Sequence, residues 1–313
     1  MPELPEVETI RRQLAPLVHG RILERIEILD PRWPRPLAPA ELSGALQGRR
    51  IQTLKRRGKY LVWEFQDDVY LAQHLRMTGS LLWSPAGEPA HVRVRMHLGG
   101  APARGAGKSP GTGESPGAAL LVITDPRRFG TGELLLGTDV LELFFAARLG
   151  LEPLQEPFTT EHLRELTRGR RAPIKALLLD QRRIAGVGNI YADEGLFRAG
   201  VHPLRPSGRL TAQQHSSLRE ALIATLRAGI DAQGASIDDF RHVDGVRGTF
   251  QNEFLVHRRA GEPCPRCGGE IVKMVVAGRG TYVCERCQPR PRRRRDGGRP
   301  GPPRAAPARP SGG

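Results

Sequence analysis

Residues 51–98 read IQTLKRRGKYLVWEFQDDVYLAQHLRMTGSLLWSPAGEPAHVRVRMHL, and their pattern decides the fold class of the first half of the chain. Apolar and polar residues alternate in short runs, such as YLVWEF at 60–65 and VRVRMHL at 92–98. A period of about 2 is typical of half-buried antiparallel strands, because successive side chains point to opposite faces of a sheet. The stretch therefore predicts a β-rich first domain.

A segment of simple composition follows directly after residue 98. Residues 99–118, GGAPARGAGKSPGTGESPGA, are mostly Gly, Pro, Ala and Ser, as in flexible linkers. They precede a strand-like run, ALLVIT at 119–124, so we predict a flexible hairpin insertion. The GKS at 107–109 is not a phosphate-binding P-loop, because Pro102 stands where that motif needs glycine.

After Gly150 the periodicity changes. Apolar residues recur at spacings of 3 and 4 in TEHLRELTRG, PIKALLLDQ, YADEGLFRAG and SSLREALIATLRAGI, which predicts helices. We therefore expect an α+β protein with a first domain at 1–150 and a helical domain at 151–262. Residues 289–313 are mainly Arg, Pro and Gly, and we expect this tail to be disordered.

Charge points to the class of partner. The 313 residues contain 48 Lys plus Arg against 33 Asp plus Glu, a formal net charge of +15. Eight Arg and one Asp in the tail contribute +7, which leaves +8 for the body (15 − 7). A positive electrostatic field of this size favours a polyanionic partner, and nucleic acid is the leading candidate. We find no apolar run long enough to cross a bilayer and no secretory core, so we expect no membrane association and a cytoplasmic, nucleoid-associated protein.

Four cysteines form two C-x2-C pairs separated by a spacer of 16 residues. Each pair can sit on a tight turn that aims two sulfurs at one point, and four thiolates form the tetrahedral cage that Zn²⁺ accepts. A redox pair or an iron site with the same ligands remains an alternative. Because four thiolates leave no open position, we predict one structural Zn²⁺ in a small module at 263–288, with ligands Cys264, Cys267, Cys284 and Cys287.

The N-terminus, MPELPEVET, places three carboxylates at the start of a basic chain. Proline at position 2 permits removal of Met1, which exposes a secondary amine with a pKa near 8 that can act as a nucleophile. Glu3 and Glu6 could face this amine if a helix begins near Pro5, and they could then move protons. The alternative is that the carboxylates only complement the helix dipole.

Six motifs follow one another along the chain. They are PELPEVETIRRQL (2–14), GKYL (58–61), HLRMTGSL (74–81), TDPRRFG (124–130), GVGNIYADEGLF (186–197) and the four cysteines. The chain closely resembles bacterial formamidopyrimidine-DNA glycosylase, the 8-oxoguanine DNA glycosylase and AP lyase, from residue 2 to about residue 288. The resemblance implies a two-domain clamp in which an N-terminal β-sandwich with a leading helix faces a helical domain with a helix-two-turns-helix motif and a zinc hairpin.

The resemblance also implies catalytic roles. Pro2 would be the Schiff-base nucleophile and Glu3 the proton donor for loss of the base. Glu6 would support the amine, and Lys59 would contact the lesion and assist β-elimination. Arg279, on the zinc hairpin, would bind phosphate and assist δ-elimination. The activity implied is removal of oxidised purines from duplex DNA in base excision repair, followed by cleavage of the strand.

Further residues are implied to contact DNA. Met77, Arg127 and Phe129 match the family's trio that fills the gap left when the damaged nucleotide is everted, a step that costs a few kcal/mol of stacking. The segment 234–249 matches a loop that covers the everted base. The local sequence around His91, EPAHVRV, departs from the family pattern. The other implied DNA contacts are His91, Arg170, Lys175 and Asn189.

Two alternatives remain open at this stage. An endonuclease VIII-like enzyme would prefer oxidised pyrimidines, and a noncatalytic zinc protein would only bind DNA. We expect a monomer that acts on DNA with an oxidised purine or an abasic site and needs no small-molecule cofactor.

Overall fold

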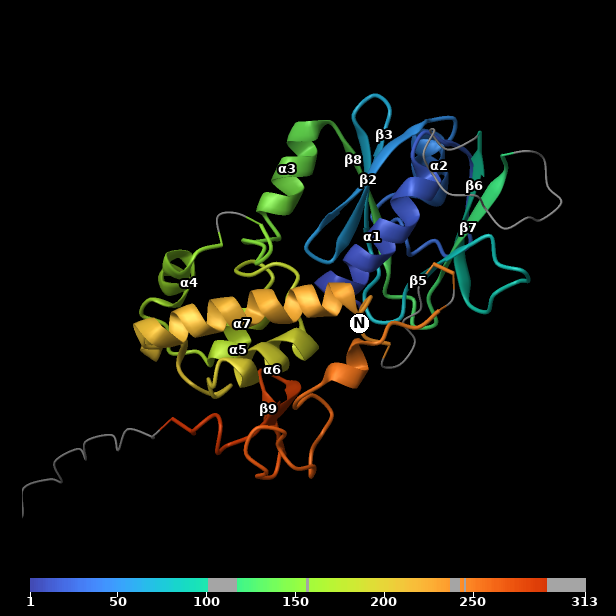
Figure 1. Cartoon of the computed structure of the whole chain (residues 1–313). Helices are drawn as coiled ribbons and strands as arrows, with labels where there is room; N and C mark the ends of the chain where they lie inside the picture. Colours follow the sequence, from blue (N-terminus) through green and yellow to red (C-terminus); the bar gives the residue numbers. More distant parts are fainter. Residues whose placement is uncertain (101–116, 156–157, 237–242, 245, 292–313) are drawn as a thin grey trace, which may run out of the picture.

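The structure is a computed structural model that describes residues 1–100, 117–155, 158–236, 243–244 and 246–291. Two four-stranded antiparallel sheets pack face to face in the N-terminal half, which confirms the predicted sandwich (Figure 1). Their strand orders are β1-β6-β7-β5 and β2-β3-β4-β8. The strands are β1 (Ile22–Ile28), β2 (Ile51–Arg57), β3 (Tyr60–Phe65), β4 (Val69–His74), β5 (Ser80–Trp83), β6 (Val92–Gly99), β7 (Ala119–Thr124) and β8 (Thr131–Leu136).

Strands β3 and β4 are buried on both faces, so the expectation of half-buried strands is wrong for them. One face, including Leu61 and Trp63, belongs to the core between the sheets. The other face, including Tyr60 and Val62, packs against an unanticipated helix, α3 (Thr138–Ala146). Helix α2 (Pro39–Leu46) and strand β1 were also not predicted.

The hairpin insertion lies between β6 and β7, as predicted. The two strands are neighbours in one sheet and pair antiparallel, with Leu98 opposite Ala119. Residues 101–116 of this insertion, and residues 292–313 of the tail, lie outside the described residues. Their predicted flexibility and disorder therefore stay predictions.

Helix α1 (Leu4–Val18) joins the two halves of the molecule. Its residues Val7, Ile10 and Leu14 are fully buried in the sandwich core, whereas Leu4 belongs to the core of the helical half. The Leu4 N–H donates to the Gly186 carbonyl at 3.0 Å, and Gly186 has a φ of +88°. A Cβ at Gly186 would lie 2.5 Å from the Leu4 side chain, so only glycine allows this approach.

The helical half confirms the periodicity seen after Gly150. Its long helix α7 packs against α1, α4 and α6, and the apolar faces of these helices share one core. Helix α7 begins with a capping box in which Thr211 and Gln214 satisfy each other's backbone N–H groups. The helices are α4 (Thr160–Thr167), α5 (Ile174–Leu179), α6 (Asn189–Arg198) and α7 (Ala212–Asp231), with short 3-10 turns η1 (Ser207–Arg209) and η2 (Phe250–Glu253).

The last described segment is a hairpin of β9 (Val272–Val276) and β10 (Arg279–Val283). It lies beside the helices, on the side away from α3 (Figure 1). The domain boundary expected near residue 150 stays a prediction. Leu149 and Ala185, which lie on either side of it in the sequence, belong to one apolar cluster. Within the described residues, no helix combines the length and the apolar character needed to span a bilayer.

Candidate active site

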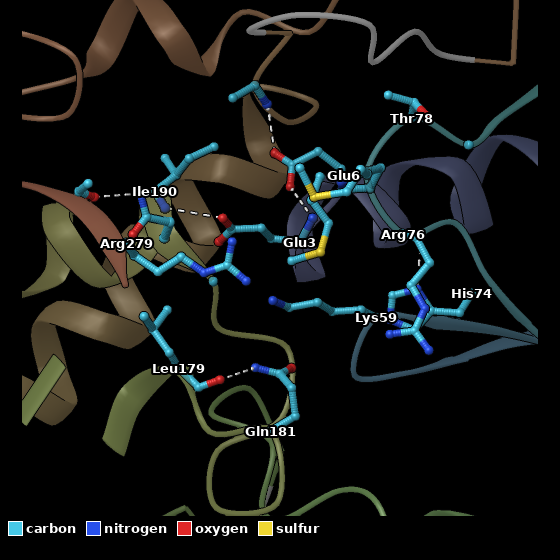
Figure 2. Close-up of a pocket in the computed structure, with 18 of the residues that line it drawn as sticks. Glu3, Glu6, Lys59, His74, Arg76, Thr78, Leu179, Gln181, Ile190 and Arg279 are labelled. Atoms are coloured by element: carbon cyan, nitrogen blue, oxygen red, sulfur yellow. Dashed lines mark hydrogen bonds between the residues drawn. The ribbon is translucent and has the colours of Figure 1, made fainter. Parts of the chain in front are cut away.

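A cavity of about 680 Å³ lies where the N-terminus, the β2–β3 turn, the start of α6 and the β9–β10 turn meet. It brings together eight residues predicted as functional from positions far apart in the sequence. Figure 2 shows Lys59 and Arg279 extending toward Glu3 from opposite sides of the cavity. The eight residues are Pro2, Glu3, Glu6, Lys59, Met77, Arg127, Asn189 and Arg279.

Glu3 is the buried N-cap of α1, and its carboxylate is held from one side only. Its Oε1 accepts the Ile190 N–H at 3.1 Å, at the first turn of α6. Its Oε2 is buried and has no hydrogen-bond partner among the described residues. A Cβ at Gly188 would lie 2.2 Å from the Glu3 carboxyl carbon, so glycine there makes room for this carboxylate.

Glu6 connects the N-terminus to two other segments. Its Oε2 accepts the Glu3 N–H at 2.8 Å, which completes the capping box of α1. Its Oε1 accepts the Tyr191 hydroxyl at 2.7 Å and the Ala235 N–H at 2.8 Å. Burial, reinforced by the charge of Glu3, raises the pKa of Glu6. The Glu6 carboxylate therefore caps helix α1, and its support of the Pro2 amine stays a prediction.

Lys59 lies on the two-residue turn between β2 and β3 and is 4 % exposed. The turn is held from the helical half, because the Gly58 N–H donates to Glu152 at 2.6 Å. Burial lowers the pKa of the Lys59 amine, against the opposing effect of Glu3 and Glu6. The amine can therefore exchange a proton closer to neutral pH than an exposed lysine can.

Among the cavity residues that were not singled out from the sequence are a histidine and an arginine. His74 and Arg76 line the cavity beside Met77, and the Arg76 N–H donates to His74 Nδ1 at 2.9 Å. Burial lowers the pKa of His74 to about 3, with help from the charges of Arg76 and Lys59. Both residues stand in the HLRMTGSL motif, so the signal that could have identified them was present.

The depressed His74 pKa gives a testable dependence of stability on pH. We expect the free energy of unfolding to fall as pH drops from about 6.5 toward about 3, because only the unfolded chain readily protonates this imidazole. The slope from His74 is at most about 1.4 kcal/mol per pH unit. The variant His74→Asn keeps an acceptor for Arg76 but does not titrate. Urea unfolding at several pH values should show a flatter acid limb for the variant, and superimposable limbs would contradict the assignment.

Lys175, predicted to contact phosphate, is fully buried, so direct contact is wrong in this structure. Its Nζ pairs with Asp193 at 2.6 Å and donates to the Thr281 hydroxyl at 2.8 Å. It also donates to the Gly280 carbonyl at 3.3 Å, and Asn189 Nδ2 donates to the same carbonyl at 2.9 Å. Lys175 and Asn189 therefore hold the start of β10, next to Arg279. A phosphate contact by Asn189 stays a prediction.

The predicted gap-filling trio lies on two turns that are tied together. The Asp125 carboxylate accepts N–H groups from Arg127 at 3.2 Å and Phe129 at 2.8 Å, and it also binds the Thr78 hydroxyl, next to Met77. The Arg127 guanidinium lies 4.8 Å from the centre of the Phe129 ring, which is 51 % exposed. An aromatic side chain presented in this way is available to a partner, but the role of the trio in DNA stays a prediction.

Two further predicted DNA contacts lie outside the cavity. His91 is exposed with a φ of +62°, and its carbonyl accepts the Asp125 N–H, so it borders the loop that carries Arg127. Arg170 is exposed between α4 and α5, and its Nε donates to Leu166. Both contacts stay predictions. Of the predicted covering loop, 234–249, residues 237–242 and 245 lie outside the described residues.

The four cysteine sulfurs converge, as predicted. The Cys264 and Cys287 sulfurs are 3.8 Å apart, the Cys267 and Cys284 sulfurs are 3.4 Å apart, and all four lie within 4.8 Å of one another. A tetrahedron with Zn–S bonds of about 2.3 Å has edges of about 3.8 Å, so the residues fit one Zn²⁺. The β9–β10 hairpin that carries Arg279 is tethered by this module.

Removal of the metal should disable the hairpin. We expect replacement of Cys264 by serine, or a strong chelator, to lower the melting temperature and weaken binding to duplex DNA by about tenfold or more, because binding free energy of a structural zinc is folding free energy. Elemental analysis of the purified protein should give one zinc per chain. A chain with iron in its place, or full DNA affinity after metal loss, would contradict this prediction.

Comparison with known families matches three consecutive parts of the chain. The formamidopyrimidine-DNA glycosylase N-terminal domain matches residues 1–132, the H2TH domain of the same enzymes matches residues 149–241, and a zinc finger found in these enzymes and in isoleucyl-tRNA synthetases matches residues 261–290. The zinc assignment therefore stands against the iron alternative, and the helix-two-turns-helix motif is confirmed.

Relatives and solved structures agree along nearly the whole chain. The formamidopyrimidine-DNA glycosylase of Chloroflexus aggregans is 43 % identical over 92 % of this chain and 98 % of its own length. The enzyme of Aromatoleum aromaticum is 42 % identical over 93 % of this chain and all of its own length. A Lactococcus lactis Fpg complex with abasic-site DNA covers 92 % of this chain and 100 % of that one, with 37 % identity and a TM-score of 0.81. The Thermus thermophilus MutM (Fpg) protein has 39 % identity, a TM-score of 0.78 and coverage of 92 % and 98 %.

A β-sandwich facing an H2TH domain and a zinc finger, with a carboxylate and two cations around the N-terminus, defines a DNA glycosylase of base excision repair. The Lactococcus lactis Fpg has been solved in complexes with DNA. Identity of about 42 % over almost the entire chain then settles the family. The chain belongs to the formamidopyrimidine-DNA glycosylases.

Proposed function

We propose that this protein is a bifunctional DNA glycosylase and AP lyase that removes 8-oxoguanine and formamidopyrimidines from duplex DNA. The observation that carries the proposal is the orphaned, buried Glu3 oxygen beside Pro2, in one cavity with Lys59 and Arg279. A proton donor, a nucleophile and two cations for phosphate are the groups that such a reaction needs. We expect the enzyme to work in the cytoplasm at the nucleoid, where bacterial DNA lies.

The first step couples nucleophilic attack to proton transfer. After removal of Met1, which lines the cavity and is 44 % exposed, the Pro2 nitrogen lone pair attacks C1′ of the damaged nucleotide. The bond between C1′ and the base breaks, and the base takes its electron pair and a proton from Glu3. The Pro2 nitrogen then gives up its N–H proton, and protonation of O4′ opens the sugar ring and leaves an iminium between Pro2 and C1′. Because the amine is secondary, this iminium carries no N–H proton and stays cationic.

The iminium drives strand cleavage by acting as an electron sink. Loss of a C2′ proton breaks the bond between C3′ and its phosphate oxygen, which is the β-elimination. Loss of a C4′ proton breaks the bond between C5′ and its phosphate oxygen, which is the δ-elimination. Lys59, with its lowered pKa, is suited to receive such a proton, and Arg279 to bind the departing phosphate. Hydrolysis finally releases Pro2.

The choice of oxidised purines is supported by the relatives. Structures of the Lactococcus lactis Fpg contain DNA with Fapy-dG or with an abasic site. The same protein has also been solved with DNA containing an oxidised pyrimidine, so a pyrimidine-directed activity is the second candidate. Met77, Arg127 and Phe129 together favour the purine branch, since the resemblance assigns this trio to it.

The experiment that tests the proposal combines two readouts. Purified full-length protein is incubated with duplexes containing 8-oxoguanine opposite cytosine, thymine glycol, or undamaged guanine, with and without sodium borohydride. We expect strand cleavage and a covalent adduct that are fastest on 8-oxoguanine, with the adduct mapped to the N-terminal peptide. Faster cleavage of thymine glycol would favour the second candidate. Binding without any adduct would indicate a noncatalytic DNA-binding protein.

A further inference from the structure

The turn that carries Lys59 lies against the part of the chain that follows the sandwich. Gly58 and Lys59 form the two-residue turn between β2 and β3, and Gly58 has a φ of +56°, which favours glycine. A Cβ at Gly58 would lie 3.2 Å from Leu149 and 3.5 Å from Ala185. The position of the Lys59 backbone is therefore set in part by residues from the second half of the molecule.

Two largely buried side chains bind both polar groups of the Gly58 backbone. Glu152 Oε1 accepts the Gly58 N–H at 2.6 Å, and Arg56 Nη1 donates to the Gly58 carbonyl at 3.0 Å. Arg56 Nη1 also pairs with Glu152 Oε2 at 2.7 Å, and the two side chains are 8 % and 3 % exposed. Because the Gly58 carbonyl and the Lys59 N–H belong to one planar peptide unit, these bonds orient the backbone from which the Lys59 side chain extends.

Arg56 also joins this turn to helix α1. Its Nε pairs with Glu8 of that helix at 3.1 Å. One guanidinium thus connects the helix that Glu3 caps, the turn that carries Lys59 and the segment that carries Glu152. A buried ion pair of this kind is costly to break, because the partner left behind keeps its charge without water around it. The three segments are therefore held in a fixed arrangement.

We propose that Glu152 and Arg56 are positioning residues that hold the Lys59 amine in place relative to Glu3 for the elimination steps. The inference rests on the proposed function of Lys59. It assigns no chemistry to Glu152 or Arg56, because neither is among the described residues that line the cavity. A lysine side chain is flexible, so its reach toward the sugar depends on where its backbone is held. A displacement of about 1 Å at a reacting group can lower a rate by about 100-fold.

The test is a double-mutant cycle on cleavage of a ready-made abasic site, measured as single-turnover rates with the full-length protein. Glu152→Ala removes the acceptor of the Gly58 N–H and should lower the rate by about 10- to 100-fold. Glu152→Gln keeps an oxygen for this N–H, so its rate should lie between those of Glu152→Ala and wild type. In a chain that already carries Lys59→Ala, Glu152→Ala should change the rate by less than about twofold, because it acts through the missing amine.

The matched control is Glu142→Ala. Glu142 pairs with Arg57, beside the same turn, at 3.2 Å, but it is exposed and is not among the residues that line the cavity. Its loss should leave the rate within about twofold of wild type, because an exposed ion pair contributes little. Melting temperatures of all variants are measured, and rates are compared where each is folded. Should Glu152→Ala not fold, the same cycle is run with Glu152→Gln.

The outcomes separate this inference from the proposed function. Losses that multiply when the Glu152 and Lys59 changes are combined, or an equal loss in Glu142→Ala, would overturn the positioning role and leave the lyase activity standing. An unchanged rate in Lys59→Ala, or no cleavage by the wild-type protein, would overturn the proposed function and this inference with it.

Discussion

Protein that keeps Met1, or that carries Pro2→Gly, will form no borohydride-trapped adduct with DNA containing 8-oxoguanine. In the first case the nitrogen is an amide and has no basic lone pair. In the second, the primary amine lacks the ring that orients it, and its Schiff base can lose a proton to give a neutral imine, which is a weaker electron sink. We expect base excision to fall by about 10³-fold or more, which corresponds to about 4 kcal/mol of activation barrier.

The control for this prediction is DNA binding. Pro2 contributes one small ring at the edge of a cavity whose cations come from other segments, so affinity for a tetrahydrofuran duplex should stay within about twofold of wild type. Mass spectrometry of the active protein should show Pro2 as its first residue. An adduct that forms at the wild-type rate in either variant would show that another amine is the nucleophile, and Lys59 would then be the first to examine.

Glu3→Gln should separate the two activities. The change keeps the shape of the side chain and an oxygen that can accept the Ile190 N–H, but it removes the proton donor. We expect release of 8-oxoguanine to fall by about 10²- to 10⁴-fold, the usual contribution of a general acid or base. Cleavage of a ready-made abasic site should fall far less, because no base has to be protonated there.

Gly188→Ala is the companion variant. Its Cβ would lie 2.2 Å from the Glu3 carboxyl carbon, so the carboxylate must move away from Ile190 while its chemistry is unchanged. A loss of glycosylase activity in both variants, with abasic-site cleavage retained, would locate the requirement in the position and protonation of Glu3. Equal losses of both activities in Glu3→Gln would contradict its assignment to base release.

The order of motifs allowed prediction of the family and of the sandwich, whereas local patterns predicted the helical half and the metal site. Cys264, Cys267, Cys284 and Cys287 were identified by their spacing, because chelation by two C-x2-C turns is a local property of the chain. The helices after Gly150 were predicted for the same reason, because the apolar periodicity of each helix is contained in its own sequence. Pro2, Glu3, Lys59 and Arg279 were named by resemblance, and the structure brings them to one cavity.

What could not be read from the sequence depends on partners distant in the chain. The expectation for Lys175 failed because a lysine looks the same whether solvent or Asp193 and Thr281 surround it. The double burial of β3 and β4 depends on α3, which lies more than 60 residues further along the chain.

The sequence alone determined which chemical groups the protein possesses, and it predicted the metal-binding turns and the main strands and helices, because these follow from residue types and short-range spacing. Helices α2 and α3 and strand β1 were not predicted. The tertiary structure decided which of those groups are buried away from water. Among the described residues, it also decided which buried polar atoms have no hydrogen-bond partner. Glu3 shows the difference: its neighbours in sequence place it at a helix start, but Gly188 and Ile190, more than 180 residues away, leave one of its oxygens buried and free. Burial and hydrogen bonding of a side chain are set by everything that packs around it, and only the folded chain specifies that.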